Sequence, residues 1–171
     1  MRYSEHNDNA KKLPSFTIIV VWKAEQYEKE SGKESMMSNF SPVEIAYLES
    51  QRLGRLATVN AAGEPHVVPM GFRYNPELDT IDIGGLNLGN TKKVRDIASN
   101  PNVAFVVDDV LPPWQAHGIE IRGKAQFLPE GGQSINPNFR PEMIRITPTR
   151  IISWGIDTDA RHRSSRTVAQ S

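Results

Sequence analysis

The chain has 171 residues, enough for one domain with a hydrophobic core and too few for two domains of ordinary size. Its 20 lysines and arginines balance 20 aspartates and glutamates, so net charge does not indicate nucleic acid or an anionic membrane as a partner. The absence of cysteine excludes disulfides, thiolate zinc sites and a cysteine nucleophile.

Residues 1–37 are predicted to be an N-terminal extension. They are polar and charged on both sides of one apolar run, Phe16 to Trp22. A bilayer span takes roughly 20 residues, and no small-residue cleavage site follows this run, so we expect neither a transmembrane helix nor a signal peptide. A lone strand or a short helix could form here, but we favour a poorly ordered arm on a cytoplasmic protein.

The domain proper is predicted to span residues 38–157 and to open with a helix. Ser41 can cap the free amides, Pro42 suits the first helical position, and Glu44 completes a capping box. An apolar stripe of about three turns is then predicted from the helical spacing of apolar side chains. The stripe consists of Ile45, Leu48 and Leu53.

A hairpin is predicted next. Residues 55–59 and 67–72 are rich in β-branched and apolar residues and flank a tight turn at residues 61–64. Pro69 lies within the second run, and proline cannot donate to a ladder, so this strand lies at an edge or a bulge. A strand with one open edge could bind a flat polar ring through its main chain.

A third strand is predicted over residues 80–84, where Gly84-Gly85 permits close approach of another group to the backbone. A short helix is predicted over residues 91–99, capped by Asn90 or Thr91 and ended by Asn100-Pro101.

The start of this helix is a candidate phosphate site. Free amides and the helix dipole converge there with Lys92 and Lys93, and a dianionic phosphate ester requires such a set. Lysines are also common at the first turn of surface helices, so taken alone the pattern favours a solvated helix end. The glycines just before it (Gly84, Gly85 and Gly89) leave room for a ligand and strengthen the phosphate hypothesis.

Three more strands complete the predicted fold. Residues 103–107 form a continuous apolar run, residues 118–128 alternate between apolar and polar, and residues 143–154 form a last strand bent at Pro148. Arg122 and Arg145 are interpreted as solvated charges on these strands. Residues 129–141 are predicted to be a long loop, and residues 158–171 a disordered tail.

Two tryptophans are candidate site residues. Trp114 follows two prolines in a predicted loop over residues 111–117, where it can stack on a planar ligand, fill a subunit interface or cover its own core. Trp154 ends the last strand, a position more typical of core than of a site.

About six strands and two helices, joined mostly by short turns, predict a mainly β fold with minor α, namely a six-stranded antiparallel barrel. The four histidines lack metal-ligand spacing, and no nucleophile elbow or phosphate loop is present. With 8% aromatic residues and no net charge, a single-stranded nucleic acid groove is not favoured either. Such a protein either binds a ligand or relies on a cofactor for its chemistry.

Seven segments, in their order along the chain, resemble those of pyridoxamine-phosphate-oxidase-like split-barrel flavoproteins, especially the class that uses the deazaflavin coenzyme F420. They are GRLATV, EPHVVPMGFRY, IDIGG, NTKKVRDI, SNPNVAFVVDD, GIEIRGKAQF and IRITPTRIISWGI. The last segment is similar to that of a subgroup that includes reductases of tetracycline biosynthesis. The resemblance covers residues 40–157.

This resemblance implies a homodimer with two sites at the subunit interface. Lys93 would hold the cofactor phosphate with Lys92 and Thr91 beside it, and the main chain around Val68, Pro69 and Met70 would contact the ring edge. Trp114, and with it Trp154, would reach the cofactor of the neighbouring subunit. Tyr74 and His66 are candidate proton donors.

Three functions are consistent with this resemblance. The first is F420-dependent reduction of an unsaturated or quinone-like small molecule, without a nucleic acid or membrane partner. The second is a carrier or sensor that binds F420 or FMN without turnover. The third is FMN-dependent oxidation of a phosphorylated amine. The third is weakened because many flavin-binding relatives carry an arginine on the third strand, where this chain reads Asp82-Ile83-Gly84-Gly85.

Overall fold

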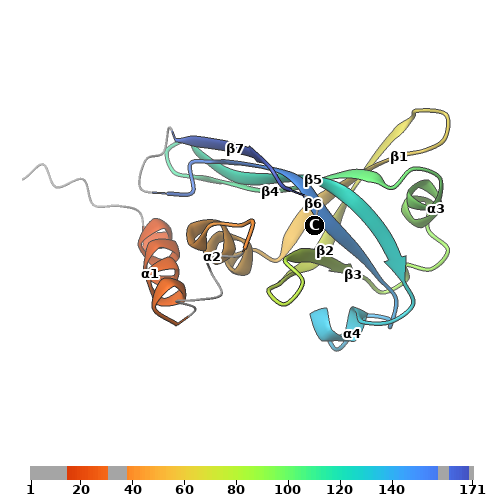
Figure 1. The fold of residues 1–171 in the computed structure, drawn as a ribbon, viewed down its shortest axis with the longest axis horizontal. Coiled ribbons are helices and arrows are strands. Elements are labelled where there is room, and N and C mark those ends of the chain that lie inside the picture. Colours follow the sequence, from red (N-terminus) through yellow and green to blue (C-terminus); the bar gives the residue numbers. More distant parts are fainter. Residues whose placement is uncertain (1–14, 31–37, 158–161, 170–171) are drawn as a thin grey trace, which may run out of the picture.

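The computed structural model describes residues 15–30, 38–157 and 162–169. Figure 1 shows a barrel with helices at its two ends and below it. The helices are α1 (Ser15–Glu30), α2 (Pro42–Ser50), α3 (Lys92–Ser99) and α4 (Gly132–Ile135). The strands are β1 (Leu53–Val59), β2 (Pro65–Asn75), β3 (Thr80–Gly84), β4 (Asn102–Leu111), β5 (Gln115–Leu128), β6 (Met143–Trp154) and β7 (Arg163–Thr167).

The strands form one antiparallel sheet in the order β3-β2-β1-β4-β5-β6-β7. An additional pairing between β3 and β6 closes the first six into a barrel and leaves β7 as an extra strand outside it. The predicted mainly β, six-stranded antiparallel barrel is therefore confirmed. Pro148 lies opposite Gly123 where the β5–β6 register shifts, at the predicted bend.

The barrel interior is filled by alternate side chains from every strand. On β5 the predicted inward set, Ile119, Ile121, Gly123 and Ala125, is buried. Phe105 of β4 packs edge-to-face on Phe72 at 5.2 Å between ring centroids. Its ring lies so close to Gly54 that a Cβ there would be 2.2 Å from the Cζ atom, so only glycine fits.

Helix α2 begins as predicted and ends earlier than predicted. The Ser41 amide donates to Glu44 Oε2 at 2.8 Å and the Glu44 amide donates to Ser41 Oγ at 3.4 Å, which forms the capping box. Ile45 and Leu48 are buried, but the helix ends at Ser50, and Leu53 lies in β1 with 56% of its surface exposed. The extension of the stripe to Leu53 was wrong, because the chain already follows a strand there.

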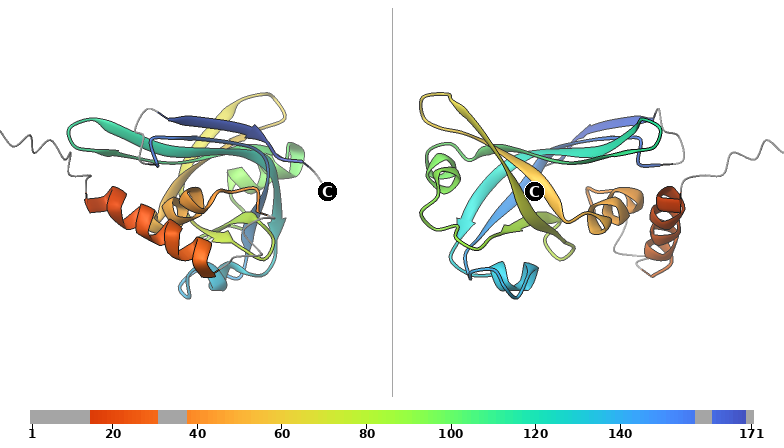
Figure 2. Two further views of the ribbon diagram at one scale, coloured as in Figure 1. Left: turned by 60° about the vertical axis from the view of Figure 1, so that its left-hand side comes forward. Right: turned by 180° about the vertical axis from the view of Figure 1, so that it is seen from behind.

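The terminal segments are more ordered than the sequence suggests. Residues 15–30, expected within a poorly ordered arm, form α1, whose Val20 is buried beside α2 at one end of the barrel (Figures 1 and 2). Residues 163–167, expected within a disordered tail, form β7 along β6. Arg166 of β7 donates to the Asn39 carbonyl and to the Glu44 carboxylate, so it ties the strand to α2. The remaining residues of both segments, 1–14, 31–37, 158–161 and 170–171, lie outside the described residues.

Two connections also differ from expectation. Strands β4 and β5 extend through most of the predicted 111–117 loop and leave only Pro112, Pro113 and Trp114 at the hairpin tip, with a cis bond between the prolines. The 129–141 loop contains the short helix α4.

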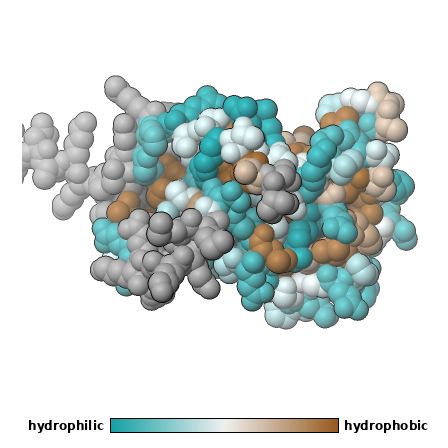
Figure 3. Space-filling view, in the orientation of Figure 1, coloured by the Kyte–Doolittle hydropathy of each residue, from teal (hydrophilic) through white to brown (hydrophobic). Residues whose placement is uncertain are grey.

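On the face shown in Figure 3, hydrophobic areas are interspersed with hydrophilic ones. Across the described residues, none of the helices is both long and apolar enough to cross a bilayer.

The seam that closes the barrel contains a buried ion pair. Asp82 of β3 lies opposite Arg145 of β6 and accepts from its Nε at 2.7 Å and from its Nη2 at 2.8 Å, while Asn75 donates to the same carboxylate at 2.9 Å. Arg145 is therefore a structural partner and not a solvated charge. Burial alone would raise the pKa of Asp82, but the hydrogen bonds from Arg145 and Asn75 and the positive charge of Arg145 outweigh it, and the net pKa lies below its ordinary value.

We expect Asp82→Asn to lower the free energy of unfolding by about 3 kcal/mol at pH 7, because Arg145, whose side chain is 23% exposed, keeps a partly buried charge without its counterion. Because the folded pKa lies below the unfolded one, the carboxylate stabilises the fold fully above about pH 4 and loses this effect as pH falls toward the folded pKa. Urea unfolding at several pH values measures the difference between variant and wild type, which should shrink in acid.

Asp108→Asn is the matched control. Asp108 pairs with Arg55 at 3.0 Å on the surface, where both side chains are more than two-fifths exposed, so its loss should change stability by less than about 1 kcal/mol. Equal effects of the two substitutions would contradict the structural role of the seam.

Candidate functional site

Half of β2 has an open edge. Residues Pro65 to Gly71 pair with β1 on one side, but β3 pairs with β2 only from Gly71 to Asn75. In the described part of the chain, no strand lies on the other side of residues 65–70. This confirms that Pro69 marks an edge, and it leaves main-chain groups on that side of the strand without a strand partner in the described structure.

The side chains along this edge alternate. Met70 is buried and Val68 is half-buried against the core, whereas Val67 and Pro69 point outward and are exposed. The Met70 methyl group lies 3.6 Å from where a Cβ would stand on Gly85. The side chain of Met70, the last residue of the open edge, therefore lies close to the start of the β3–α3 connection.

The N-terminus of α3 lies at the end of the same connection. Thr91 is the N-cap residue, but its hydroxyl donates back to the Leu88 carbonyl at 2.8 Å and makes no cap hydrogen bond. The predicted side-chain cap is thus absent here. Asn90 is exposed, and its carbonyl accepts from Arg95 Nη1 at 2.8 Å. The first-turn amides of α3 are left without a capping side chain, as an anion site requires.

The two lysines of this turn differ in environment. Lys92 Nζ lies 3.2 Å from both carboxylate oxygens of Asp96, one turn later on the helix. Lys93 is half-buried, and the described residues give its ammonium group no hydrogen-bond or ion-pair partner. Burial lowers the pKa of Lys93. Of the two, Lys93 is the one available to an anion.

Asp96 organises a small polar cluster behind this turn. It is 4% exposed and accepts from Thr58 Oγ1 at 2.9 Å in addition to Lys92. Burial would raise its pKa, but the Thr58 and Lys92 hydrogen bonds, with the charges of Lys92 and His66, bring the net pKa below its ordinary value. His66 pairs with Thr58 across the hairpin, and its Nδ1 is buried without a hydrogen-bond partner in the described structure.

Of the two candidate proton donors, only His66 belongs to this cluster. The Tyr74 hydroxyl is inside the molecule and donates to Asp79 Oδ1 at 2.8 Å. Sequence reasoning missed Asp96 and Thr58. The i,i+4 spacing of Lys92 and Asp96 could have indicated the pair.

Gly84 has a different role from the predicted one. A Cβ at Gly84 would lie 2.3 Å from Cδ2 of Phe139, and the Phe139 ring also contacts Gly71, which lies opposite Gly84 across the β2–β3 ladder. The group that approaches this glycine is therefore an aromatic ring of the same chain. Gly85 is more open, with its nearest contact to Leu88 at 3.4 Å.

Trp114 and Trp154 do not join the other candidates within one chain. Trp114 is 88% exposed at the tip of the β4–β5 hairpin, so it does not cover its own core. The ring of Trp154 lies over Gly118, near the start of β5, whereas the segment after α3 binds the other end of β5 at Ala125. Those two positions on β5 are roughly 23 Å apart at strand rise, and Figures 1 and 2 show α3 at the end of the barrel away from the hairpin tip.

One hollow of the surface lies elsewhere. It measures about 510 Å³ between the end of α2 and the β2–β3 turn and is lined by Leu48, Phe72, Arg73 and Glu77 among others. The candidate proton donor Tyr74 also lines it, but none of the predicted cofactor-binding residues does. Within the described residues, no three histidine, aspartate or glutamate side chains gather as a metal site would require.

Comparison with known proteins gives a consistent result. Residues 43–155 match the family described as pyridoxamine 5'-phosphate oxidase. The chain is 49% identical, over 122 residues, to the 5a,11a-dehydrotetracycline/5a,11a-dehydrooxytetracycline reductase of Streptomyces rimosus. This match covers 70% of this chain and 86% of that protein.

Two solved structures share the fold. General Stress Protein 26 from Bacillus anthracis superposes with a TM-score of 0.51 at 22% identity, covering 71% of this chain and 92% of that one. A heme binding protein from Mycobacterium smegmatis superposes with a TM-score of 0.53 at 16% identity, covering 70% of this chain and 54% of that one.

The lowered pKa of Lys93 gives a chemical test of its environment. We expect the rate of its acetylation by acetic anhydride, followed by mass spectrometry, to reach half its maximum below the ordinary lysine value of about 10.4, because more of its amine is neutral at a given pH. Lys92, held by Asp96, is the internal comparison. A midpoint for Lys93 at or above 10.4 would contradict the half-buried, unpaired ammonium.

Proposed function

Because the chain belongs to the pyridoxamine 5'-phosphate oxidase family, we propose that this oxidoreductase transfers a hydride from reduced F420 to an unsaturated or quinone-like small molecule. The observation that carries the proposal is the open edge of β2 beside the uncapped start of α3 with its unpaired Lys93. The 49% identity to a reductase of S. rimosus indicates the acceptor class, a polycyclic molecule with a conjugated double bond.

The residues at the β2 edge fit a phosphorylated tricyclic cofactor. The free amides at the start of α3 and the Lys93 ammonium would hold the phosphate. The main chain of Val68, Pro69 and Met70 would hydrogen-bond the polar edge of the ring, and Gly85 leaves room beside it. The unpartnered Nδ1 of His66 is a further polar atom at this place.

The β3 sequence favours F420 over FMN. Residues 82–85 of this chain contain no arginine, and Asp82 is itself neutralised by Arg145. A dianionic FMN phosphate would thus lack the second cation that many flavin-binding relatives use. FMN-dependent oxidation of a phosphorylated amine is accordingly the weaker alternative.

Positioning is the main task left to the protein. Reduced F420, when bound, supplies a hydride and not single electrons. The β2 edge would keep the ring flat against the sheet, and an acceptor held face to face with it reacts without a dedicated nucleophile. His66 would hold the proton that the other end of the double bond takes up, with solvent as the alternative source.

A homodimer would complete the site. The outer face of β2, β1 and β4 carries small and branched apolar side chains on neighbouring strands, with ion pairs at its margin, a composition suited to a second copy of the chain. The apolar residues are Val67, Ala57, Ala104 and Val106, and the ion pairs are Arg55–Asp108 and Arg122–Glu120. In such a dimer, Trp114 and Trp154 would each face the cofactor of the partner, which accounts for a tryptophan that is 88% exposed in one chain.

A carrier or sensor that binds F420 without turnover is the second candidate, favoured because residues 65–70, all of them described, carry His66 as their one titratable side chain. Turnover distinguishes the two. The purified protein is mixed with reduced F420 and a panel of enones, quinones and dehydrotetracycline-type acceptors, and the return of F420 absorbance is followed. Reoxidation at the enzyme-free rate across the whole panel would favour the carrier.

We expect Lys93→Ala to weaken F420 binding by about 1–3 kcal/mol, because a charge-assisted contact to the phosphate is lost. Lys92→Ala is the matched control and should have a smaller effect, since that ammonium already pairs with Asp96. Quenching of tryptophan fluorescence during titration with F420 and with FMN measures both. An unchanged affinity in Lys93→Ala would refute this phosphate site.

A further inference from the structure

A second hollow lies at the end of the barrel opposite α3. It measures about 280 Å³ and is enclosed by the start of α2, the end of β6 and the strand β7. Its walls include Ser41, Val43, Ser153, Trp154, Ile156 and Ser164, together with the pairs Glu44–Arg166 and Asp157–His162.

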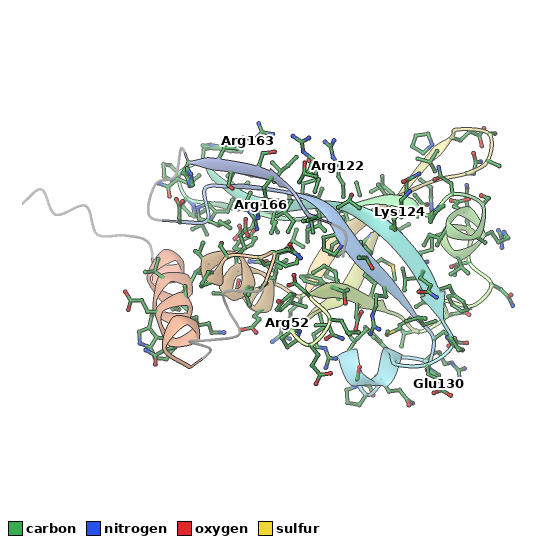
Figure 4. The ribbon with its side chains drawn as sticks, in the orientation of Figure 1. Arg52, Arg122, Lys124, Glu130, Arg163 and Arg166 are labelled. Carbon is green, nitrogen blue, oxygen red and sulfur yellow. The ribbon has the colours of Figure 1, made fainter. Side chains whose placement is uncertain are left out.

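One wall of this hollow comes from a segment outside the part of the chain that matches the family. The match ends at residue 155, whereas His162, Ser164 and Arg166 belong to β7 and the residue before it. This wall is held firmly, because Arg166 donates to the Asn39 carbonyl and to the buried Glu44 carboxylate. Figure 4 shows Arg166 on the side of β7 that faces α2, whereas Arg163 points away from the barrel. Part of the wall of the hollow therefore lies outside the segment that matches the family.

The lining indicates what kind of molecule would fit. Each charged side chain already has a partner of opposite charge, so the hollow does not select a phosphate or a cation. What remains is the indole of Trp154 with two aliphatic side chains and the Ser164 hydroxyl group, while the Ser41 and Ser153 hydroxyl groups also line the hollow but already hydrogen-bond Glu44. An aromatic wall with several hydroxyl groups suits a neutral ring that carries hydroxyl or keto groups.

The size of the hollow limits how much of such a molecule it can hold. Sites for whole small molecules measure roughly 300–1,000 Å³, and about 280 Å³ is below that range. It could take one or two rings at the edge of a polycycle while the remaining rings extend past Trp154. That direction leads toward the place where the proposed dimer would put the partner's cofactor.

We infer that this hollow is the specificity pocket for the acceptor and binds its oxygenated edge, so that β7 helps to decide which polycyclic molecule is reduced. The inference rests on the proposed function, because Trp154 must face the cofactor of the partner for the acceptor to be within reach of the hydride. It assigns the acceptor to the residues of this hollow, of which only Trp154 is shared with the proposed cofactor contacts, and the two assignments can be tested separately.

The test uses a substitution that fills the hollow. Ser164→Trp places an indole in it, and Ser165→Trp is the matched control, because Ser165 is the next residue on the strand and faces the opposite way. Tetracycline serves as a probe that is not reduced, with binding measured by isothermal titration calorimetry on the full chain. We expect Ser164→Trp to raise the Kd for tetracycline at least tenfold and Ser165→Trp to change it less than twofold.

Binding of F420 to the same proteins separates the assignment of the acceptor pocket from the proposed F420-dependent function. Both variants should bind F420 within twofold of wild type, since α3 and the β2 edge are untouched. A Kd for tetracycline within twofold of wild type in Ser164→Trp, equal losses in both variants, or no tetracycline binding by wild type would overturn the pocket assignment. Ser164-dependent binding of tetracycline by a protein that binds no F420 would support the pocket and contradict the proposed function.

A second variant covers the case in which Ser164→Trp does not fold. His162→Leu removes a polar wall residue whose side chain is 56% exposed, so it leaves the barrel intact. We expect a threefold to fivefold increase in KM for a reducible acceptor at saturating reduced F420, with an unchanged Kd for F420. An unchanged KM would count against the pocket.

Discussion

The length of β3 determines where a ligand can reach the sheet. This strand has five residues and must pair with β6 to close the barrel, so it covers only the second half of the eleven-residue β2. The buried pair Asp82–Arg145 fixes that closure across the seam. Because β3 ends at Gly84, the chain turns away to α3 and leaves residues 65–70 of β2 with an open edge beside an uncapped helix start. A shorter seam would open the barrel, and a longer β3 would cover the edge.

The charges at the start of α3 follow from the same arrangement of strands. Asp96, held by Thr58 of β1, pairs with Lys92 and leaves Lys93 as the cation of that turn without a partner among the described residues. The opposite end of the barrel is built differently, from Trp154, α2 and the added strand β7, with its charges paired. Under the proposed function, one end would hold the cofactor and the other end, supplied by the partner subunit, would bind the acceptor.

Features that depend on local chemistry could be predicted from the sequence. The capping box at Ser41, the edge position of Pro69 and the β5 alternation all follow from spacing within a few residues. Features that depend on distant partners could not. Arg145 looked solvated because its partner Asp82 is far away in sequence, and Gly84 looked like a ligand contact because Phe139 comes from a later loop. The sequence of β7 resembles a polar tail because this edge strand has no apolar face. Its stability comes from pairing with β6 and from the contact of Arg166 with α2, which the sequence does not reveal.

The most direct test of the hydride-transfer account is isotopic. Reduced F420 carrying deuterium at the carbon that donates the hydride is mixed with the protein and a dehydrotetracycline-type acceptor, and the product is examined by mass spectrometry and NMR. The account predicts one deuterium, at one carbon and on one face, in ordinary water. A product that contains no deuterium from the cofactor, or no product at all while F420 remains bound, would contradict it.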